Sequence, residues 1–503
     1  MSRALDPEFV ALPLKQLADA ALSRAKELGA THADVRVERI RTANLRLHDA
    51  KVETSYDDDE RGMSVRVVHD GTWGFAGGTV LTVDAAARLA DEAVAIARAS
   101  RPVNTEPVDL APEPSYGEVT WVSAYDVDPF EVAPADRVAL LQEWSARLLR
   151  ADAVAHADAS LRQVKENKFY ADLAGTMTTQ QRVRLQCQLE ASWIEETSGR
   201  FESMRTIAPP VGRGYEFLTE RGIYDWDAEL DELPALLAEK AAAPTVEAGS
   251  YDLVVDPSNL WLTIHESIGH ATELDRALGY EANYAGTSFA TPDQLGTLVY
   301  GSPVMHVTGD RQADHGLSTV GWDDEGVAGQ TWDLIKDGIL VGYQLDRRIA
   351  RKTGQERSNG CAFGDSPLHP AIQRMANVSL QPAAGGPSTE ELIGGIDNGI
   401  YIVGDKSWSI DMQRYNFQFT GQRFYRISGG RLDGMLRDVA YQATTTDFWR
   451  SMEAVGGPQT YVLGGAFNCG KGQPGQTAPV SHGCPSALFR GVRILNTVEE
   501  GAA

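Results

Sequence analysis

Apolar residues at helical spacing mark four segments in the first half of the chain. They predict helices over residues 14–28, over residues 82–99, from Pro134 onward, and over residues 230–240. In the last of these, Pro234 is compatible with a helix only if it falls in the first turn, where its missing N–H costs nothing.

Other segments alternate apolar and polar residues with a period of two, which predicts strands. Residues 33–40 and 64–68 show this pattern, and Asp70-Gly71 predicts a tight turn out of the second strand. Further strands are expected between residues 153 and 193. From Gly301 onward, short apolar runs separated by glycine turns indicate a β-rich region.

A change in composition divides the chain. Residues 241–249 (AAAPTVEAG) read as a linker, followed by a short strand and a helix that is capped by Asp256 and expected to reach about residue 274. We therefore predict an α+β fold. An N-terminal domain, residues 1–240, combines helices with an antiparallel sheet, and a β-rich C-terminal domain, residues 250–503, carries the helix after Asp256.

Composition excludes several classes of protein. Of the 503 residues, 43% are hydrophobic and 23% charged, which is typical of a globular chain. The net charge of -24 disfavours nucleic-acid binding, and the acidic run at residues 57–60 is expected to form a solvated loop. The four cysteines are scattered, and the sequence shows neither an apolar leader nor a long apolar run. These features predict a cytoplasmic protein without a membrane span.

The helix after Asp256 contains a candidate metal site. Its sequence His-Glu-x-x-x-His brings together His265, Glu266 and His270. The two histidines are five residues apart, so a regular α-helix would turn them about 140° from each other. A local π-turn would return both to one face, and Gly269 eases such a distortion. We predict a bulged or unwound turn between Ile268 and His270.

A catalytic zinc ion takes three protein ligands and keeps one open position. The third ligand is open at this point, because spacing does not choose among Cys469, Cys484, Cys361, His482 and several acids. Cys469 lies in a glycine-rich segment expected to form a loop, which would let its thiolate approach an ion. Cys484 and His482 are more simply explained as packing residues of a loop.

Longer motifs resemble one protein family. The helix motif, followed by Glu273 and Asp275, is similar to that of the TldD/PmbA family, specifically its catalytic TldD-like branch. Residues 323–330 (DDEGVAGQ), 337–343 (DGILVGY) and 469–473 (CGKGQ) match further family motifs in the family's order. The acids at residues 323–325 suit either a tight turn or support of the metal ligands.

The resemblance implies a zinc peptidase in which His265, His270 and Cys469 bind Zn²⁺ and Glu266 is the catalytic carboxylate. It implies hydrolysis of unfolded or precursor peptides, including precursors of ribosomally made peptide natural products. It also implies a dimer, formed either by two copies or with a PmbA/TldE-like paralogue that lacks the metal motif. The chain departs from the family in a longer segment at residues 276–297 and in residues 408–414.

Two other hypotheses belong to different classes. One is a metal-holding but non-catalytic peptide-binding or regulatory subunit, against which the intact Glu266 argues. The other is a DNA-related regulator, which the acidity of the chain disfavours.

Overall fold

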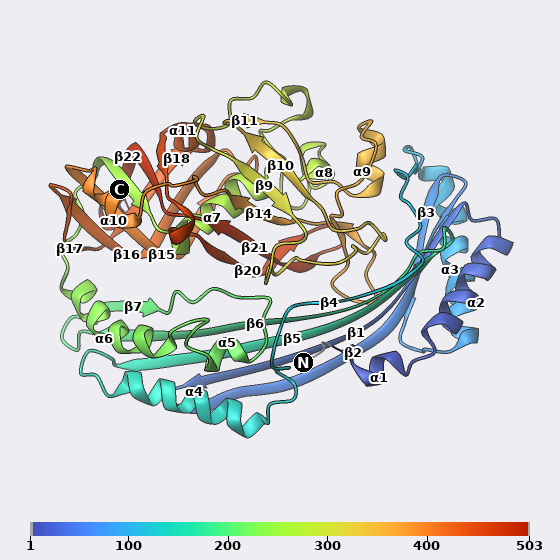
Figure 1. Cartoon of the computed structure of the whole chain (residues 1–503), viewed down its shortest axis with the longest axis horizontal. Helices are drawn as coiled ribbons and strands as arrows, with labels where there is room; N and C mark the ends of the chain where they lie inside the picture. The colour runs from blue at the N-terminus through green and yellow to red at the C-terminus, as the bar shows by residue number, and fades with distance from the viewer. Residues whose placement is uncertain (1–3, 501–503) are drawn as a thin grey trace.

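Four long antiparallel strands run the length of the N-terminal half in the computed structural model, which describes residues 4–500 and side chains through residue 498 (Figure 1). They are β1 (His32–His48), β2 (Lys51–His69), β5 (His156–Asp172) and β6 (Met177–Ile194). The shorter strands are β3 (Thr72–Gly78), β4 (Glu118–Val122) and β7 (Phe201–Arg205). The sheet order is β3-β2-β1-β5-β6-β4, with β7 also on β6, and only the β4–β6 pair among these strands is parallel. Residues 1–3 and 501–503, the outer ends of the two predicted domains, lie outside the described residues.

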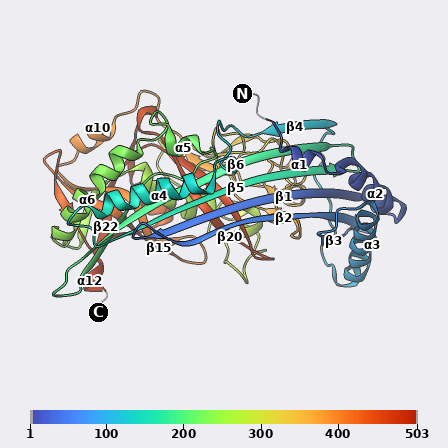
Figure 2. The same ribbon diagram turned by 90° about the horizontal axis from the view of Figure 1, so that it is seen from below.

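The two faces of this sheet differ in polarity. Helices cover the apolar face, with α2 (Leu14–Glu27) and α3 (Val83–Ser100) at one end and α4 (Pro134–Leu149) and α6 (Trp226–Ala242) at the other (Figure 2). The opposite face carries charged side chains toward the C-terminal half. There Asp324 pairs with Lys168 at 2.7 Å and with Arg36 at 3.1 Å. The two halves therefore meet through buried ion pairs.

A closed ring of strands forms the core of the C-terminal half. The strands are β15 (Asn398–Ile410), β8 (Gly249–Val255), β22 (Ala487–Asn496), β18 (Val439–Thr444) and β16 (Asn416–Ser428), and the ring closes because β16 also pairs with β15. β17 (Arg431–Leu436) extends β16, and β19 (Met452–Val455) pairs with β22. Aromatic side chains fill the interior, including Phe417, Phe448 and Phe489.

Smaller elements surround this ring. The hairpin of β20 (Val462–Lys471) and β21 (Gln476–Cys484) lies beside the helix α7 (Pro257–Ile264). A second sheet contains β9 (Val307–Asp310), β10 (Thr331–Lys336), β11 (Ile339–Leu340) and β14 (Asn377–Leu380), and β12 (Ala362–Phe363) pairs with β13 (Ile372–Gln373). The short helices are α1 (Pro7–Val10), α5 (Glu216–Thr219), α8 (Leu274–Ala277), α9 (Arg347–Lys352), α10 (Thr389–Gly394), α11 (Thr445–Arg450) and α12 (Thr497–Glu500).

The predicted α+β class is confirmed, and so are the helices near residues 14, 82 and 134. Thr82 caps α3 through the N–H of Ala85. Asp70 and Gly71 form the turn between β2 and β3 with φ values of 46° and 65°, the left-handed pair that a two-residue hairpin turn needs. The division into domains at residues 241–249 stays a prediction; this segment connects α6 to β8.

Several expectations were wrong. α6 begins at Trp226, because Asp225 caps it, and Pro234 therefore lies inside the helix while neighbouring leucines pack into the core. The acidic run at residues 57–60 is largely exposed to solvent, as expected, but it belongs to strand β2 and not to a loop, and Asp59 pairs there with Arg39 and Arg61.

The acids at residues 323–325 form a turn that joins the two halves of the chain. Asp323 accepts backbone N–H groups from Glu325, Val327 and Ala362. Asp324 and Glu325 pair with basic residues of the long sheet, Glu325 with Arg66 at 2.9 Å. Among the described residues, no helix has the length and apolarity that crossing a membrane requires.

Candidate metal centre

The helix α7 delivers the first two candidate ligands. Asp256 accepts the N–H of Ser258 at the N-terminus, as predicted, and the helix then changes to a π-turn over His265–Gly269. The N–H of His270 donates to the carbonyl of His265 at 3.0 Å, across five residues. This wider turn brings the two imidazole rings to one side, with centroids 4.7 Å apart. The predicted distortion is therefore present, although it begins at His265, and the helix does not continue to residue 274.

Gly269 leaves room for Met375 to pack against the π-turn. A Cβ atom at this position would lie 2.5 Å from the sulfur of Met375, closer than atoms can pack. The side-chain amide of Gln344 donates to the carbonyl of Gly269 at 2.7 Å, which satisfies a backbone acceptor that the distorted helix leaves unpaired.

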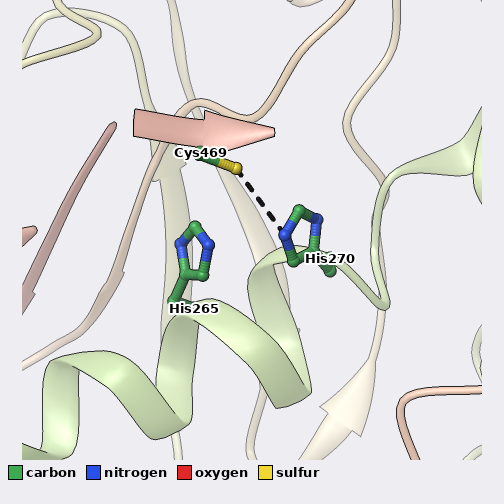
Figure 3. A group of neighbouring side chains, drawn as sticks. All are labelled: His265, His270 and Cys469. Atoms are coloured by element: carbon green, nitrogen blue, oxygen red, sulfur yellow. Dashed lines mark hydrogen bonds between the residues drawn. The ribbon is translucent and has the colours of Figure 1, made fainter. Parts of the chain in front are cut away.

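Strand β20 brings the third candidate ligand to the same point. The pairing of β20 with β21 is irregular between Ala466 and Cys469, and the Cys469 sulfur lies 3.6 Å from Nε2 of His270 (Figure 3). One ligand atom each from His265, His270 and Cys469 lies within 4.8 Å of the others. Cys469 was expected in a loop, but it belongs to a strand whose backbone Arg374 holds by donating to the Cys469 carbonyl at 2.5 Å.

The remaining cysteines do not join this group. Cys484 packs in the core with its sulfur 3.6 Å from the carbonyl of Pro257, and the thiol of Cys361 contacts the Asn359 side chain at 3.3 Å. Within residues 4–498, Cys469 is the cysteine that the structure groups with both histidines.

A chain of hydrogen bonds fixes the orientation of His265. Nδ1 of His482 lies 2.9 Å from the carbonyl of Val378, an acceptor only, so Nδ1 must carry the proton and donate. Nε2 of His482 is then an acceptor, and it lies 2.7 Å from Nδ1 of His265, which donates to it. Nε2 of His265 is consequently left with a lone pair. His482 therefore fixes the tautomer of His265. It was expected in a loop, but it lies in strand β21.

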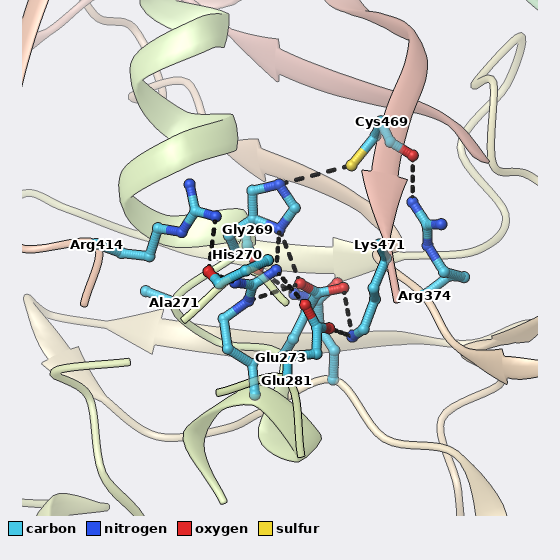
Figure 4. A network of polar contacts seen from close by, with 12 residues as sticks. Gly269, His270, Ala271, Glu273, Glu281, Arg374, Arg414, Cys469 and Lys471 are labelled. Carbon is cyan, nitrogen blue, oxygen red and sulfur yellow. Dashed lines mark hydrogen bonds and ion pairs between the residues drawn. The ribbon is translucent and has the colours of Figure 1, made fainter. Parts of the chain in front are cut away.

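His270 is held in the same tautomer by a carboxylate. Its Nδ1 donates to Glu273 at 2.8 Å, so Nε2 keeps the lone pair and faces Cys469 (Figure 4). Lys471, fully buried, pairs with Glu273 at 2.9 Å and with Asp275 at 2.8 Å. Burial alone would raise the pKa of Glu273, but Lys471 and His270 hold it well below its ordinary value.

The donor set fits a zinc ion. Burial lowers the pKa of His265 and, together with Arg276, lowers that of His270 well below its ordinary value, so both imidazoles are neutral ligands. Burial raises the pKa of the Cys469 thiol to about 11, and a cation beside the sulfur would favour the thiolate. Two neutral imidazoles and one thiolate form a typical set of zinc ligands with a position left open.

Glu266 lies beside the two histidines at the edge of a cavity of about 470 Å³. One carboxylate oxygen accepts a hydrogen bond from Arg414 at 2.7 Å, and Arg414 also lines the cavity. Gln186 and Gln188 of the long sheet line the opposite wall, so both halves of the chain enclose the candidate site.

Reasoning from the sequence missed most of the supporting residues. Arg414, Lys471 and Arg374 were not singled out, and His482 was weighed mainly as a packing residue. Strand β21 is buried at every position except Thr477, and a histidine in such a strand requires a polar partner.

Family models match two parts of this chain. Residues 248–496 match the PmbA/TldA metallopeptidase C-terminal domain, and residues 33–97 match PmbA/TldA metallopeptidase domain 1. Similar curated proteins include a metalloprotease of Methanothermobacter thermautotrophicus, 25% identical over 93% of this chain and 96% of its own length. A protein of Saccharolobus solfataricus named zinc metalloprotease TldD homolog is 23% identical over 94% of this chain and 98% of its own length.

Solved structures share the fold. A Thermotoga maritima protein described as a putative modulator of a DNA gyrase has a TM-score of 0.73 and 16% identity, covering 96% of this chain and 100% of that one. TldE from Thermococcus kodakarensis has a TM-score of 0.72 and 15% identity, covering 94% and 98%. At such identities the likeness concerns the fold alone.

Proposed function

Because this chain belongs to the PmbA/TldD metallopeptidase family, we propose that it is a zinc-dependent peptidase. In this proposal His265, His270 and Cys469 hold Zn²⁺, and Glu266 is the catalytic carboxylate. The observation that carries the proposal is the convergence of two neutral imidazoles, from the two ends of the π-turn after α7, and one thiol from β20 at a cavity that Glu266 also lines.

Each nearby side chain has a defined task. Bound zinc would supply a Lewis acid that activates water and polarises the scissile carbonyl at neutral pH. Glu266 takes a proton from the attacking water and returns it to the leaving amine. Arg414 orients the Glu266 carboxylate. His482 and Glu273 keep the ring nitrogens Nε2 of the two histidines unprotonated.

The substrate in this proposal is an extended peptide, either unfolded or a precursor that requires maturation. Among the strands that the structure describes, β20 pairs only with β21, and its residues 464–470 line the cavity. An extended peptide that adds to the free edge of β20 would form main-chain hydrogen bonds beside Cys469. Recognition through the backbone suits a peptidase that accepts many unfolded sequences.

The alternative proposal is a metal-holding, non-catalytic peptide-binding subunit. One observation favours it: Arg414 pairs with Glu266 at 2.7 Å and so occupies one of its two carboxylate oxygens. In either case we propose a cytoplasmic dimer, formed by two copies or with a TldE-like paralogue. Light scattering of the purified chain, alone and mixed with such a paralogue, tests the assembly.

Hydrolysis of casein separates the two proposals. The zinc-loaded protein, assayed with a TldE-like paralogue where it has one, should release peptides. A chelator should abolish the release, and added zinc should restore it. Glu266→Gln should retain zinc and lose about 10²-fold or more of the turnover, whereas Glu143→Gln, on the exposed side of α4, should match the wild type. Zinc-loaded protein without hydrolysis, or a fully active Glu266→Gln variant, would contradict the peptidase proposal.

A further inference from the structure

Three arginines lie together on the polar face of the long sheet. In the antiparallel pair of β5 and β6, Glu166 lies opposite Arg182, Val164 opposite Arg184, and Arg162 opposite Gln186. Directly opposed residues share one face of a sheet. Arg162, Arg182 and Arg184 therefore project toward the C-terminal half from neighbouring positions; we call them the arginine cluster.

The arginine cluster has one carboxylate for three positive charges. Glu166 accepts from Arg182 at 2.7 Å with one oxygen and from Arg184 at 2.5 Å with the other. Lys168 also lies 3.5 Å from Glu166, but Asp324 pairs with this lysine at 2.7 Å. Among the residues that the structure describes, no carboxylate pairs with Arg162 within 4.0 Å.

The unpaired charge shows in the hydrogen bonds. Nε and Nη1 of Arg184 are buried without a partner in the described structure, and so is Nε of Arg162. Burial and the neighbouring Arg182 lower the pKa of Arg184 to about 10. A buried donor without an acceptor destabilises the structure, so this cluster favours the arrival of an anion. In a chain of net charge -24, a cluster of three arginines with one carboxylate is a local exception.

The arginine cluster adjoins the candidate metal centre. Nη1 of Arg162 donates to the side chain of Asn468 at 2.6 Å, and Asn468 precedes Cys469. The guanidinium of Arg162 also lies 5.2 Å from the Phe467 ring centroid. Gln186 and Gln188 continue the same face into the catalytic cavity.

A second cavity lies at the other end of the arginine cluster. It has a volume of about 430 Å³, and Arg182 and Arg184 line it. The other ionisable side chains of this cavity are His315 and Asp314, and Asp314 is exposed to solvent. The arginines therefore lie between a space beside the metal centre and a space large enough for further peptide residues.

We propose that Arg162, Arg182 and Arg184 form a subsite for a carboxylate of the bound peptide, either its C-terminal carboxylate or the side chain of an aspartate or glutamate. The planar guanidinium offers paired N–H donors that match a carboxylate. A peptide lying along β20 with its carboxylate in this subsite is held beside the metal centre at a defined position. The subsite rests on the proposed peptidase function and adds a substrate class to it.

Binding of three matched peptides tests the subsite. The peptides share one neutral sequence and a fluorescent label: the first has a free C-terminal carboxylate, the second a C-terminal amide, and the third an amide with one internal glutamate. Anisotropy is measured with the zinc-loaded Glu266→Gln protein, which should bind peptide without cleaving it. We expect at least one carboxylate peptide to bind about tenfold more tightly than the neutral amide, with a difference that shrinks in high salt.

Substitutions assign this preference to the arginines. Arg162→Gln, at a half-buried position, and Arg184→Gln should each reduce the preference for a carboxylate peptide to within about twofold. Arg98→Gln, on the exposed side of α3, should keep the full preference. Preference for the first peptide alone identifies a C-terminal carboxylate, and preference for the third alone identifies an acidic side chain. Equal binding of all three peptides, or a preference that survives both substitutions, overturns the subsite.

Casein hydrolysis by protein with Glu266 intact, measured in parallel, separates this result from the proposed function. Zinc-dependent hydrolysis without any carboxylate preference would contradict the subsite but support the peptidase proposal. A carboxylate preference without hydrolysis would contradict the peptidase proposal but support a carboxylate-binding site.

Discussion

Replacing His482 should weaken zinc binding, although His482 is not a proposed ligand. Its Nε2 accepts from Nδ1 of His265 at 2.7 Å, and the side chain is fully buried. In His482→Leu, the Nδ1–H of His265 has no acceptor, or the proton moves to Nε2 and blocks the ligand atom. An unsatisfied buried donor costs about 1–3 kcal/mol, and loss of such a supporting group typically reduces metal affinity 10–100-fold.

The assay is a competition for zinc between the protein and a chromophoric chelator at neutral pH. His482→Gln is the matched variant, because its side-chain oxygen is an acceptor and leucine has none; it should lose less than about tenfold. The zinc-induced rise in Tm gives a second readout and shows that each apo variant is folded. If His482→Leu is folded and binds zinc as tightly as the wild type, the hydrogen-bond chain does not control His265 and the reasoning is wrong.

Three other predictions concern stability. Lys471→Met removes the buried cation that Glu273 and Asp275 share and should lower the free energy of unfolding by about 3–5 kcal/mol in urea titrations. Lys15→Met, at an exposed ion pair, should change it by under about 1 kcal/mol; equal effects would contradict the assigned role. Gly269→Ala should cost about 1–3 kcal/mol or release zinc, because the new Cβ would lie 2.5 Å from Met375; an unchanged Tm and zinc content would contradict tight packing of Met375 on Gly269. Burial raises the pKa of Glu38 to about 7, so the folded state keeps this proton to higher pH than the unfolded state and loses stability as pH rises from about 4.5 to 7. The stability of Glu38→Gln relative to the wild type should therefore increase between pH 5 and pH 8, and an equal difference at both pH values would refute this account.

Local signals predicted the regular elements well where cap, turn and periodicity agreed. The cap at Asp256 and the turn at Asp70-Gly71 are local chemistry, and both are present. The failures came from tertiary contacts. Residues 57–60 form a strand because their backbone pairs with β1, whose Arg39 also binds Asp59. Helix α6 tolerates Pro234 because the leucines around it pack into the core.

The candidate site was predictable to a similar extent. The five-residue spacing of His265 and His270 required a π-turn on geometric grounds alone, and the structure has one. The choice of Cys469 as third ligand rested on family resemblance, because no spacing rule links residues about two hundred positions apart. His482 and Arg414 acquire their roles only when β21 and the turn after β15 fold against α7, which local sequence does not encode.

The zinc content of purified protein tests the central claim most directly. Elemental analysis of the wild type, His265→Ala and Cys469→Ala should give about one zinc per chain in the wild type and little in either variant. Loss of zinc in His265→Ala alone would contradict the role of Cys469. A wild-type protein that stays free of zinc after reconstitution would contradict the proposed zinc peptidase itself.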